Sequence, residues 1–216
     1  MVSINSPLNL IDLNTGNIGS VMKMLTRIGA SPTVCKLPND IDEGVPIVIP
    51  GVGHFSKAAQ GLDAGKWREC LDKLHTANRP ILGICLGAQL LCQSSEEGLG
   101  AGLGWIPTTV RRFPSADSSG TPLRVPHMSW QNFTPPDGCF PFPVHSGRMY
   151  YAQSHYIEPT SVPAYSPYQS HYGDIQFAAV VRSNNAIGFQ FHPEKSHLYG
   201  MALLRSWLAW ACECYS

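Results

Sequence analysis

A cysteine stands between two glycines where the sequence pattern changes from strand to helix. Within residues 80–90, Cys85 follows a short apolar run typical of a buried strand and precedes an amphipathic run typical of a helix. Gly83 and Gly87 lack a β-carbon, so they permit the sharp turn that lifts such a residue out of a sheet. The first N–H groups of the helix favour a thiolate and can hold an oxyanion. This segment predicts a nucleophile elbow with Cys85 as the nucleophile.

A nucleophile of this kind needs a base, and residues 189–195 offer one directly after a second apolar segment. If this segment leaves a strand, His192 and Glu194 project to the same side, roughly 6–7 Å apart along the backbone. Pro193 between them fixes its φ near about −65° and stiffens that arrangement. The sequence therefore predicts a triad of the acyl-transfer type. His192 takes the proton of the Cys85 thiol and returns it to a leaving amine, while Glu194 orients the ring.

Cys85 is one of seven cysteines, and a lone buried cysteine usually behaves as a small inert hydrophobe. The glycines that flank Cys85 and the segment that contains His192 favour a catalytic role for Cys85. The other cysteines have no metal-type spacing, so we expect structural roles for them and neither a metal nor a cofactor; they are Cys35, Cys70, Cys92, Cys139, Cys212 and Cys214. A thiolate nucleophile and the lack of a signal segment predict a cytoplasmic location.

Composition narrows the possible classes of protein. The chain has 216 residues, of which 44% are hydrophobic, and we expect one domain spanning residues 1–216. Fifteen basic residues balance fifteen acidic ones, so the chain has no excess of positive charge with which to bind nucleic acid. No apolar run approaches the roughly 20 residues that span a bilayer, so we expect no membrane partner.

The first part of the chain alternates strand and helix patterns, which predicts a mostly parallel sheet with helices on both faces. The second part contains short β-like runs, which predict antiparallel strands appended to that sheet. We expect strands at 8–12, 33–35, 45–49, 80–84, 108–111, 123–125, 149–156, 177–181 and 186–191. We expect helices near 21–28, 67–77 and 197–211, turns at 14–17 and 182–185, and a surface loop at 158–174.

Ligands of open parallel sheets bind beyond the carboxyl ends of the strands. Three motifs follow expected strands in this way: the turn at 50–53, Cys85, and His192. The turn at 50–53 is either a plain tight turn or part of the site. Beside a nucleophile, the N–H groups of Val52 and Gly53 become candidates for an oxyanion hole, with Leu86 N–H as a further donor.

The segments Gly-Ile-Cys-Leu-Gly-Ala-Gln at 83–89 and His-Pro-Glu at 192–194 resemble the signatures of class I, triad-type glutamine amidotransferases. The resemblance covers nearly the whole chain and implies their flavodoxin-like α/β fold. A narrower resemblance is to the glutaminase subunits of imidazole glycerol phosphate synthase, the HisH group. The segments that carry it are 12–17, 50–53, 95–97, 125–128 and 190–196.

The resemblance implies hydrolysis of L-glutamine to glutamate and ammonia. It implies that Gln89 and the backbone from Gly51 to Gly53 position glutamine, and that the backbone of Ser154 and His155 contacts its amino-acid end. In this group, ammonia passes through a tunnel to a (β/α)8 cyclase subunit of a heterodimer. The cyclase makes imidazole glycerol phosphate and an aminoimidazole carboxamide ribotide in histidine biosynthesis.

The chain departs from the usual pattern of this group at three positions. Gln153 replaces a histidine, His155 replaces a tyrosine, and Ser129 stands where glycine is usual. These changes leave open a paralogue that supplies ammonia to another acceptor, such as an enzyme amidating a surface sugar. A catalytically weak scaffold and a cysteine hydrolase acting on peptides or γ-glutamyl compounds are further alternatives.

Four more residues near the motifs could belong to the site or to an interface. For His54 and His127 we expect a hydrogen-bonded structural role rather than catalysis. Lys195 and Ser196 follow the base, and they belong either to a partner contact or to a solvated turn.

Overall fold

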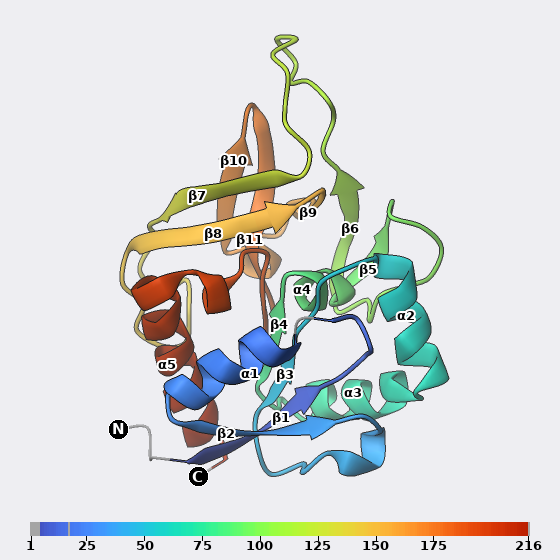
Figure 1. The fold of residues 1–216 in the computed structure, drawn as a ribbon, viewed down its shortest axis with the longest axis vertical. Helices are drawn as coiled ribbons and strands as arrows, with labels where there is room; N and C mark the ends of the chain where they lie inside the picture. The colour runs from blue at the N-terminus through green and yellow to red at the C-terminus, as the bar shows by residue number, and fades with distance from the viewer. Residues whose placement is uncertain (1–4, 17, 216) are drawn as a thin grey trace.

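A seven-stranded sheet forms the centre of the computed structural model, which describes residues 5–16 and 18–215 (Figure 1). The strand order is β10-β11-β12-β4-β3-β1-β2. The strands from β12 to β2 are parallel, and β10 and β11 are antiparallel additions at one edge. The bounds are β1 Ser6–Ile11, β2 Ala30–Cys35, β3 Ile47–Ile49, β4 Ile81–Ile84, β10 Tyr168–Tyr172, β11 Ile175–Ser183 and β12 Ala186–Phe189.

Helices cover both faces of this sheet, as the sequence predicted. Side chains of β3 alternate between the two faces: Val48 packs in one buried cluster with α1 and α5, whereas Ile47 and Ile49 pack in the other with α2, α3 and α4. The helices are α1 Ile18–Arg27, α2 Phe55–Ala64, α3 Trp67–Thr76, α4 Leu86–Leu90 and α5 His197–Glu213. Within residues 5–16 and 18–215, no helix is both long and apolar enough to cross a membrane.

Two smaller sheets lie beyond the carboxyl edge of the central parallel strands (Figure 1). The strands β5 Cys92–Ser95, β6 Ile106–Arg112 and β9 His155–Ile157 form one sheet, and the antiparallel pair β7 His127–Phe133 and β8 Gly147–Gln153 forms the other. A hydrogen bond of 2.8 Å from His192 N to Tyr150 O ties β8 to the segment after β12. The added strands therefore cover the edge where ligands of such sheets bind.

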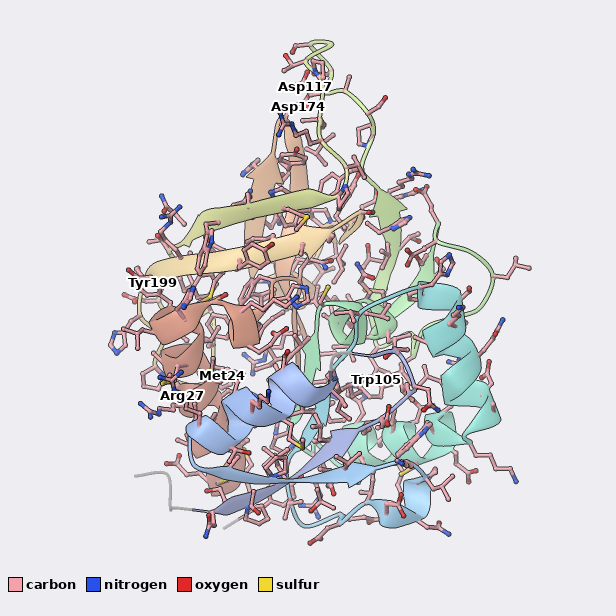
Figure 2. All side chains as sticks on the ribbon, in the orientation of Figure 1. Met24, Arg27, Trp105, Asp117, Asp174 and Tyr199 are labelled. Carbon is pink, nitrogen blue, oxygen red and sulfur yellow. The ribbon has the colours of Figure 1, made fainter. Side chains whose placement is uncertain are left out.

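The structure differs from the predicted elements in the second half of the chain. Residues 123–125 form no strand; they belong to a loop that projects together with the β10–β11 turn. Figure 2 shows Asp117 and Asp174 at the tip of this projection, where Ser118 N donates to Asp174 Oδ2 at 3.0 Å. The expected loop at 158–174 contains β10, whose polar sequence gives no strand signal but which pairs with the free edge of β11. Asn17, in the expected turn at 14–17, lies outside the described residues.

The sequence analysis also missed α2 and β5. The buried residues of α2 are Phe55, Ala58, Ala59 and Leu62, which is a helical spacing. This signal was therefore present in the sequence, but no element was predicted between the turn at 50–53 and the helix at 67–77. β5 is short and mostly polar, so only its pairing with β6 defines it.

Candidate active site

Cys85 occupies a strained turn between β4 and α4. Its φ of 52° and ψ of −104° lie outside the regions that residues with a β-carbon normally adopt. Cys85 N donates to Phe189 O of the neighbouring strand β12 at 2.8 Å, and Gln89 N donates to Cys85 O at 3.0 Å to begin the helix. Hydrogen bonds on both sides thus hold the thiol at the carboxyl end of β4.

Gly87 allows α4 to approach β3 closely at this turn. A β-carbon on Gly87 would lie 1.8 Å from Ile49 O, and one on Gly83 would lie 2.7 Å from the Gly87 carbonyl carbon and oxygen. No side chain fits at either distance. Both glycines of the predicted elbow are therefore required by contacts between backbones, in addition to the turn itself.

His192 and Glu194 form a buried pair next to this turn. His192 Nδ1 lies 2.8 Å from Glu194 Oε1, and both side chains are almost fully buried. We expected His192 to leave an extended strand, but residues 193–195 form a short 3-10 turn instead. This turn places the Glu194 carboxylate next to the His192 ring. The predicted pair therefore forms, but through a 3-10 turn and not through an extended strand.

The Cys85 sulfur and the His192 ring lie close enough to interact electrostatically. Burial of the imidazole disfavours its charged form, but the neighbouring Cys85 sulfur and the Glu194 carboxylate outweigh this effect and raise the pKa of His192 to about 10. The ring is therefore held protonated opposite the sulfur at neutral pH. This arrangement supplies a proton for a leaving group, with Glu194 on the far nitrogen to orient the ring.

Ser196 holds the base segment in place. Its hydroxyl donates to His192 O at 2.6 Å and accepts from Tyr150 N of β8 at 3.0 Å, and the residue is fully buried. Ser196 therefore does not belong to a solvated turn, whereas its neighbour Lys195 is exposed. No local pattern indicates this link, because it joins residues 46 positions apart in the chain.

A small cavity opens beside Cys85, with a volume of about 170 Å³. It is smaller than the roughly 300–1,000 Å³ of most small-molecule sites, which favours a small substrate. The cavity is lined by Val52, Gly53, Cys85, Leu86, Gln89, Glu97, Pro126, Ala152, Gln153, Ser154 and His155. Seven of these were expected site residues, whereas Gly51, His192 and Glu194 are not in the lining.

The expected oxyanion donors do not converge on one point. Leu86 N donates to Gly51 O at 3.4 Å, so the carbonyl of the Gly51–Val52 peptide unit is turned toward Leu86. Because a trans peptide carries its C=O and N–H on opposite sides, Val52 N–H points the other way. Rotation of this one peptide unit would exchange the two groups and complete a hole between Val52 and Leu86.

Strand β9 fixes the orientation of the Gln89 side chain. Gln89 Nε2 donates to His155 O at 3.1 Å and to Gln190 Oε1 at 3.4 Å, and Gln190 Oε1 also accepts from Ile157 N at 3.2 Å. A backbone N–H can only donate and a carbonyl can only accept, so both amide orientations are determined. Gln89 therefore has its Oε1 left to accept a hydrogen bond.

The carbonyl oxygens of Ser154 and His155 already have partners. Ser154 O accepts from Phe113 N at 3.0 Å, and His155 O accepts from Gln89. Both residues line the cavity as expected. Because their carbonyl oxygens already accept hydrogen bonds, we expect a substrate to contact other atoms of these two residues.

Glu97 is a cavity residue to which the sequence analysis gave no role. Its Oε2 accepts from Phe55 N at 2.8 Å, and its Oε1 lies 3.3 Å from His155 Nδ1. Burial favours the neutral acid, but these two donors outweigh burial and lower the pKa of Glu97, so a carboxylate faces the cavity. The contacts join three separate segments, which explains why spacing along the chain did not reveal them.

His54 and His127 both have structural surroundings. His54 caps α2, with its Nδ1 accepting from Ser56 N at 3.3 Å. His127 is buried at the start of β7, where it stacks on Tyr172 with ring centroids 4.0 Å apart, and its Nε2 lies 2.7 Å from Ser129 Oγ. Neither residue lines the cavity beside Cys85.

The free energy of unfolding is expected to fall as the pH drops from about 6.5 to about 4, because burial lowers the pKa of His127 to about 4. In that window the unfolded chain binds a proton that the folded protein excludes, so stability rises with pH, by up to about 3 kcal/mol from this group. Denaturant unfolding at both ends of the window measures the slope. A His127→Gln protein, which cannot titrate there, should show a smaller slope; an equal slope contradicts the assignment.

Comparisons with known proteins show which family the chain resembles. The profile of the family described as "Glutamine amidotransferase class-I" matches residues 9–209. The chain is 37% identical over 205 residues to "Imidazole glycerol phosphate synthase subunit HisH 2" of Pseudomonas aeruginosa, covering 92% of this chain and 97% of the relative. It is also 37% identical over 206 residues to the HisH subunit of Synechocystis sp., covering 92% and 94%.

Solved structures share the fold at low sequence identity. A protein described as "Crystal structure of glutamine amidotransferase" superposes with a TM-score of 0.72 at 16% identity, covering 94% of this chain and 98% of that one. "Structure of PurLQS from Thermotoga maritima" gives a TM-score of 0.69 at 16% identity, covering 98% and 99%. At such identities the likeness concerns the fold alone.

Proposed function

The chain belongs to the class-I glutamine amidotransferase family, and we propose that it is the glutaminase subunit of an imidazole glycerol phosphate synthase. The observation that carries the catalytic part of the proposal is the placement of Cys85, on its strained turn, next to His192, whose ring contacts Glu194 at 2.8 Å. The activity is hydrolysis of L-glutamine to L-glutamate and ammonia.

The reaction begins with attack by the Cys85 sulfur on the side-chain carbonyl carbon of glutamine. The C–N bond then breaks as His192 gives its proton to the departing nitrogen, which leaves as ammonia. The raised pKa of His192 suits this step, because the ring already holds the proton that the leaving group needs. A glutamyl thioester remains on Cys85.

Water completes the turnover. Neutral His192 takes a proton from the attacking water, the C–S bond breaks, and glutamate leaves while the thiol–imidazole pair regains its proton. Both steps develop negative charge on the carbonyl oxygen, and Leu86 N–H and Val52 N–H become its donors once the Gly51–Val52 peptide unit has rotated. The Glu97 carboxylate provides a site for the α-ammonium group of glutamine, which carries the opposite charge.

The partner in this proposal is the cyclase subunit, with which the chain forms a heterodimer. Ammonia passes to that subunit and is used there to make imidazole glycerol phosphate and an aminoimidazole carboxamide ribotide. The HisH relatives favour this acceptor over the surface-sugar alternative, and the close contact of Cys85 with His192 argues against an inert scaffold. We place the protein in the cytoplasm, where a reactive thiol stays reduced.

Glutaminase activity of the isolated chain is expected to be low and to rise by roughly 10²–10³-fold with the cyclase subunit and its nucleotide substrate. This factor is the typical effect of one oxyanion donor on kcat. The donor in question is Val52 N–H, which points away from the site while Gly51 O accepts from Leu86 N. Glutamate release with and without the partner measures it. Equal and high activity in both samples would contradict the need for rotation, and no stimulation by the cyclase would favour another acceptor enzyme.

A further inference from the structure

Glu97 and His155 form a contact in the wall of the cavity beside Cys85. Glu97 follows β5, and His155 is the first residue of β9. Glu97 Oε1 lies 3.3 Å from His155 Nδ1, and both residues line the cavity. The Glu97 and His155 side chains keep 18% and 12% of their surface exposed, respectively, so the pair lies at the cavity wall and not within the core.

Each of the two carboxylate oxygens of Glu97 has a donor. Phe55 N, the first N–H of α2, donates to Oε2 at 2.8 Å. A carboxylate can only accept, so the His155 ring carries a proton on Nδ1 and donates it to Oε1. A carboxylate oxygen accepts more than one hydrogen bond, so Glu97 keeps capacity for a ligand that brings several donors.

The backbone of His155 is fixed independently of Glu97. His155 pairs with Arg112 in the antiparallel ladder of β6 and β9, and His155 O accepts from Gln89 Nε2 at 3.1 Å. The ring is thus carried by a strand that also orients Gln89. Glu97, by contrast, precedes a glycine-rich segment that begins with Gly98, whose φ is 121°. His155 is therefore the fixed member of the pair, and Glu97 is the member that needs to be held.

On the basis of the proposed function, we propose that His155 is a positioning residue that holds the Glu97 carboxylate in the orientation that receives the α-ammonium group of L-glutamine. A carboxylate that is already held loses little rotational freedom when the ligand binds, so the contact increases the affinity for the substrate. His155 acts at the amino-acid end of glutamine. It therefore affects binding and leaves the cleavage of the C–N bond unchanged.

Steady-state kinetics of the complex with the cyclase subunit and its nucleotide test this role. His155→Leu is expected to raise the KM for L-glutamine roughly 10-fold, the effect of losing one hydrogen bond to a charged group, while kcat stays within about 2-fold. His155→Asn keeps an N–H donor close to the position of Nδ1 and is expected to restore most of the lost affinity. His155→Phe replaces the leucine variant if that protein does not fold. An unchanged KM in the variant without the donor, or an equally raised KM in His155→Asn, overturns the inference.

A double-mutant cycle shows whether His155 acts through Glu97. Glu97→Gln keeps an acceptor for Phe55 N but removes the charge that attracts the ammonium group, so this variant is expected to raise the KM by itself. In that background, His155→Leu should raise the KM by less than about 2-fold more, because the carboxylate that His155 positions is gone. A full 10-fold rise on top of Glu97→Gln would mean that the two residues act independently, which overturns the inference.

Glu96 provides the matched control for a merely structural role. It precedes Glu97 and holds the same segment through Arg111 Nη1 at 2.8 Å and Arg112 N at 2.9 Å, but it does not line the cavity. Glu96→Ala is therefore expected to leave the KM unchanged. If it raises the KM as much as His155→Leu does, the effect comes from anchoring the segment, and the inference is overturned. If the folded parent complex releases no glutamate from L-glutamine, the proposed function fails instead.

Discussion

Glutamine hydrolysis is expected to fall by roughly 10⁴-fold or more when Cys85 is replaced by alanine, because the thioester then cannot form. Alanine keeps the β-carbon and removes only the sulfur, so the turn between β4 and α4 is retained. Glutamate release, measured with the cyclase partner and its nucleotide present, gives the largest signal from which to follow the loss.

Two controls distinguish a lost nucleophile from a damaged fold. Cys92 is also fully buried, and burial raises the pKa of its thiol, so it stays protonated. Cys92→Ala should therefore keep hydrolysis within a few-fold of the parent. The Cys85→Ala complex, supplied with ammonium salt, should still support the cyclase reaction, because ammonia then needs no glutamine. Substantial glutamate release by Cys85→Ala would refute the catalytic assignment.

The elbow could be predicted from the sequence because its determinants are local. An apolar run, a cysteine between two glycines and an amphipathic run are all contained in residues 80–90. The approach of His192 to Cys85 could also be anticipated, because each residue follows a strand and the carboxyl ends of parallel strands share one edge of the sheet. In the structure these strands are β4 and β12, which are parallel neighbours. The order of the strands in the sheet, however, was not predicted and comes from the structure alone.

What the sequence could not provide depends on contacts between distant segments. Glu97 becomes a cavity residue only because Phe55 and His155 hold its two oxygens. The orientation of the Gly51–Val52 peptide unit is likewise a matter of one hydrogen bond to Leu86, for which residue types give no signal. The same holds for β10, a polar strand that exists because the edge of β11 lies beside it.

Gly200→Ala is expected to lower kcat roughly 10²-fold without touching any group of the reaction. A β-carbon on Gly200 of α5 would lie 1.9 Å from Pro193 O, between His192 and Glu194. The helix or the turn must therefore move by an ångström or more, and misplacement on that scale costs about this factor. Steady-state kinetics should show the loss mainly in kcat, since the residues of the cavity wall belong to other segments.

The position of the base, and not only its presence, is what this substitution tests. Gly19→Ala in α1 is the matched control, because a β-carbon there meets nothing within 4 Å and alanine favours a helix by up to about 1 kcal/mol over glycine. That variant should keep full activity and gain stability. Gly200→Ala protein that folds and keeps the parent kcat would show that the segment from His192 to Glu194 moves freely with α5. The Ser196 bridge to His192 O and Tyr150 N argues against such freedom, because it anchors the base segment to β8 independently of the helix.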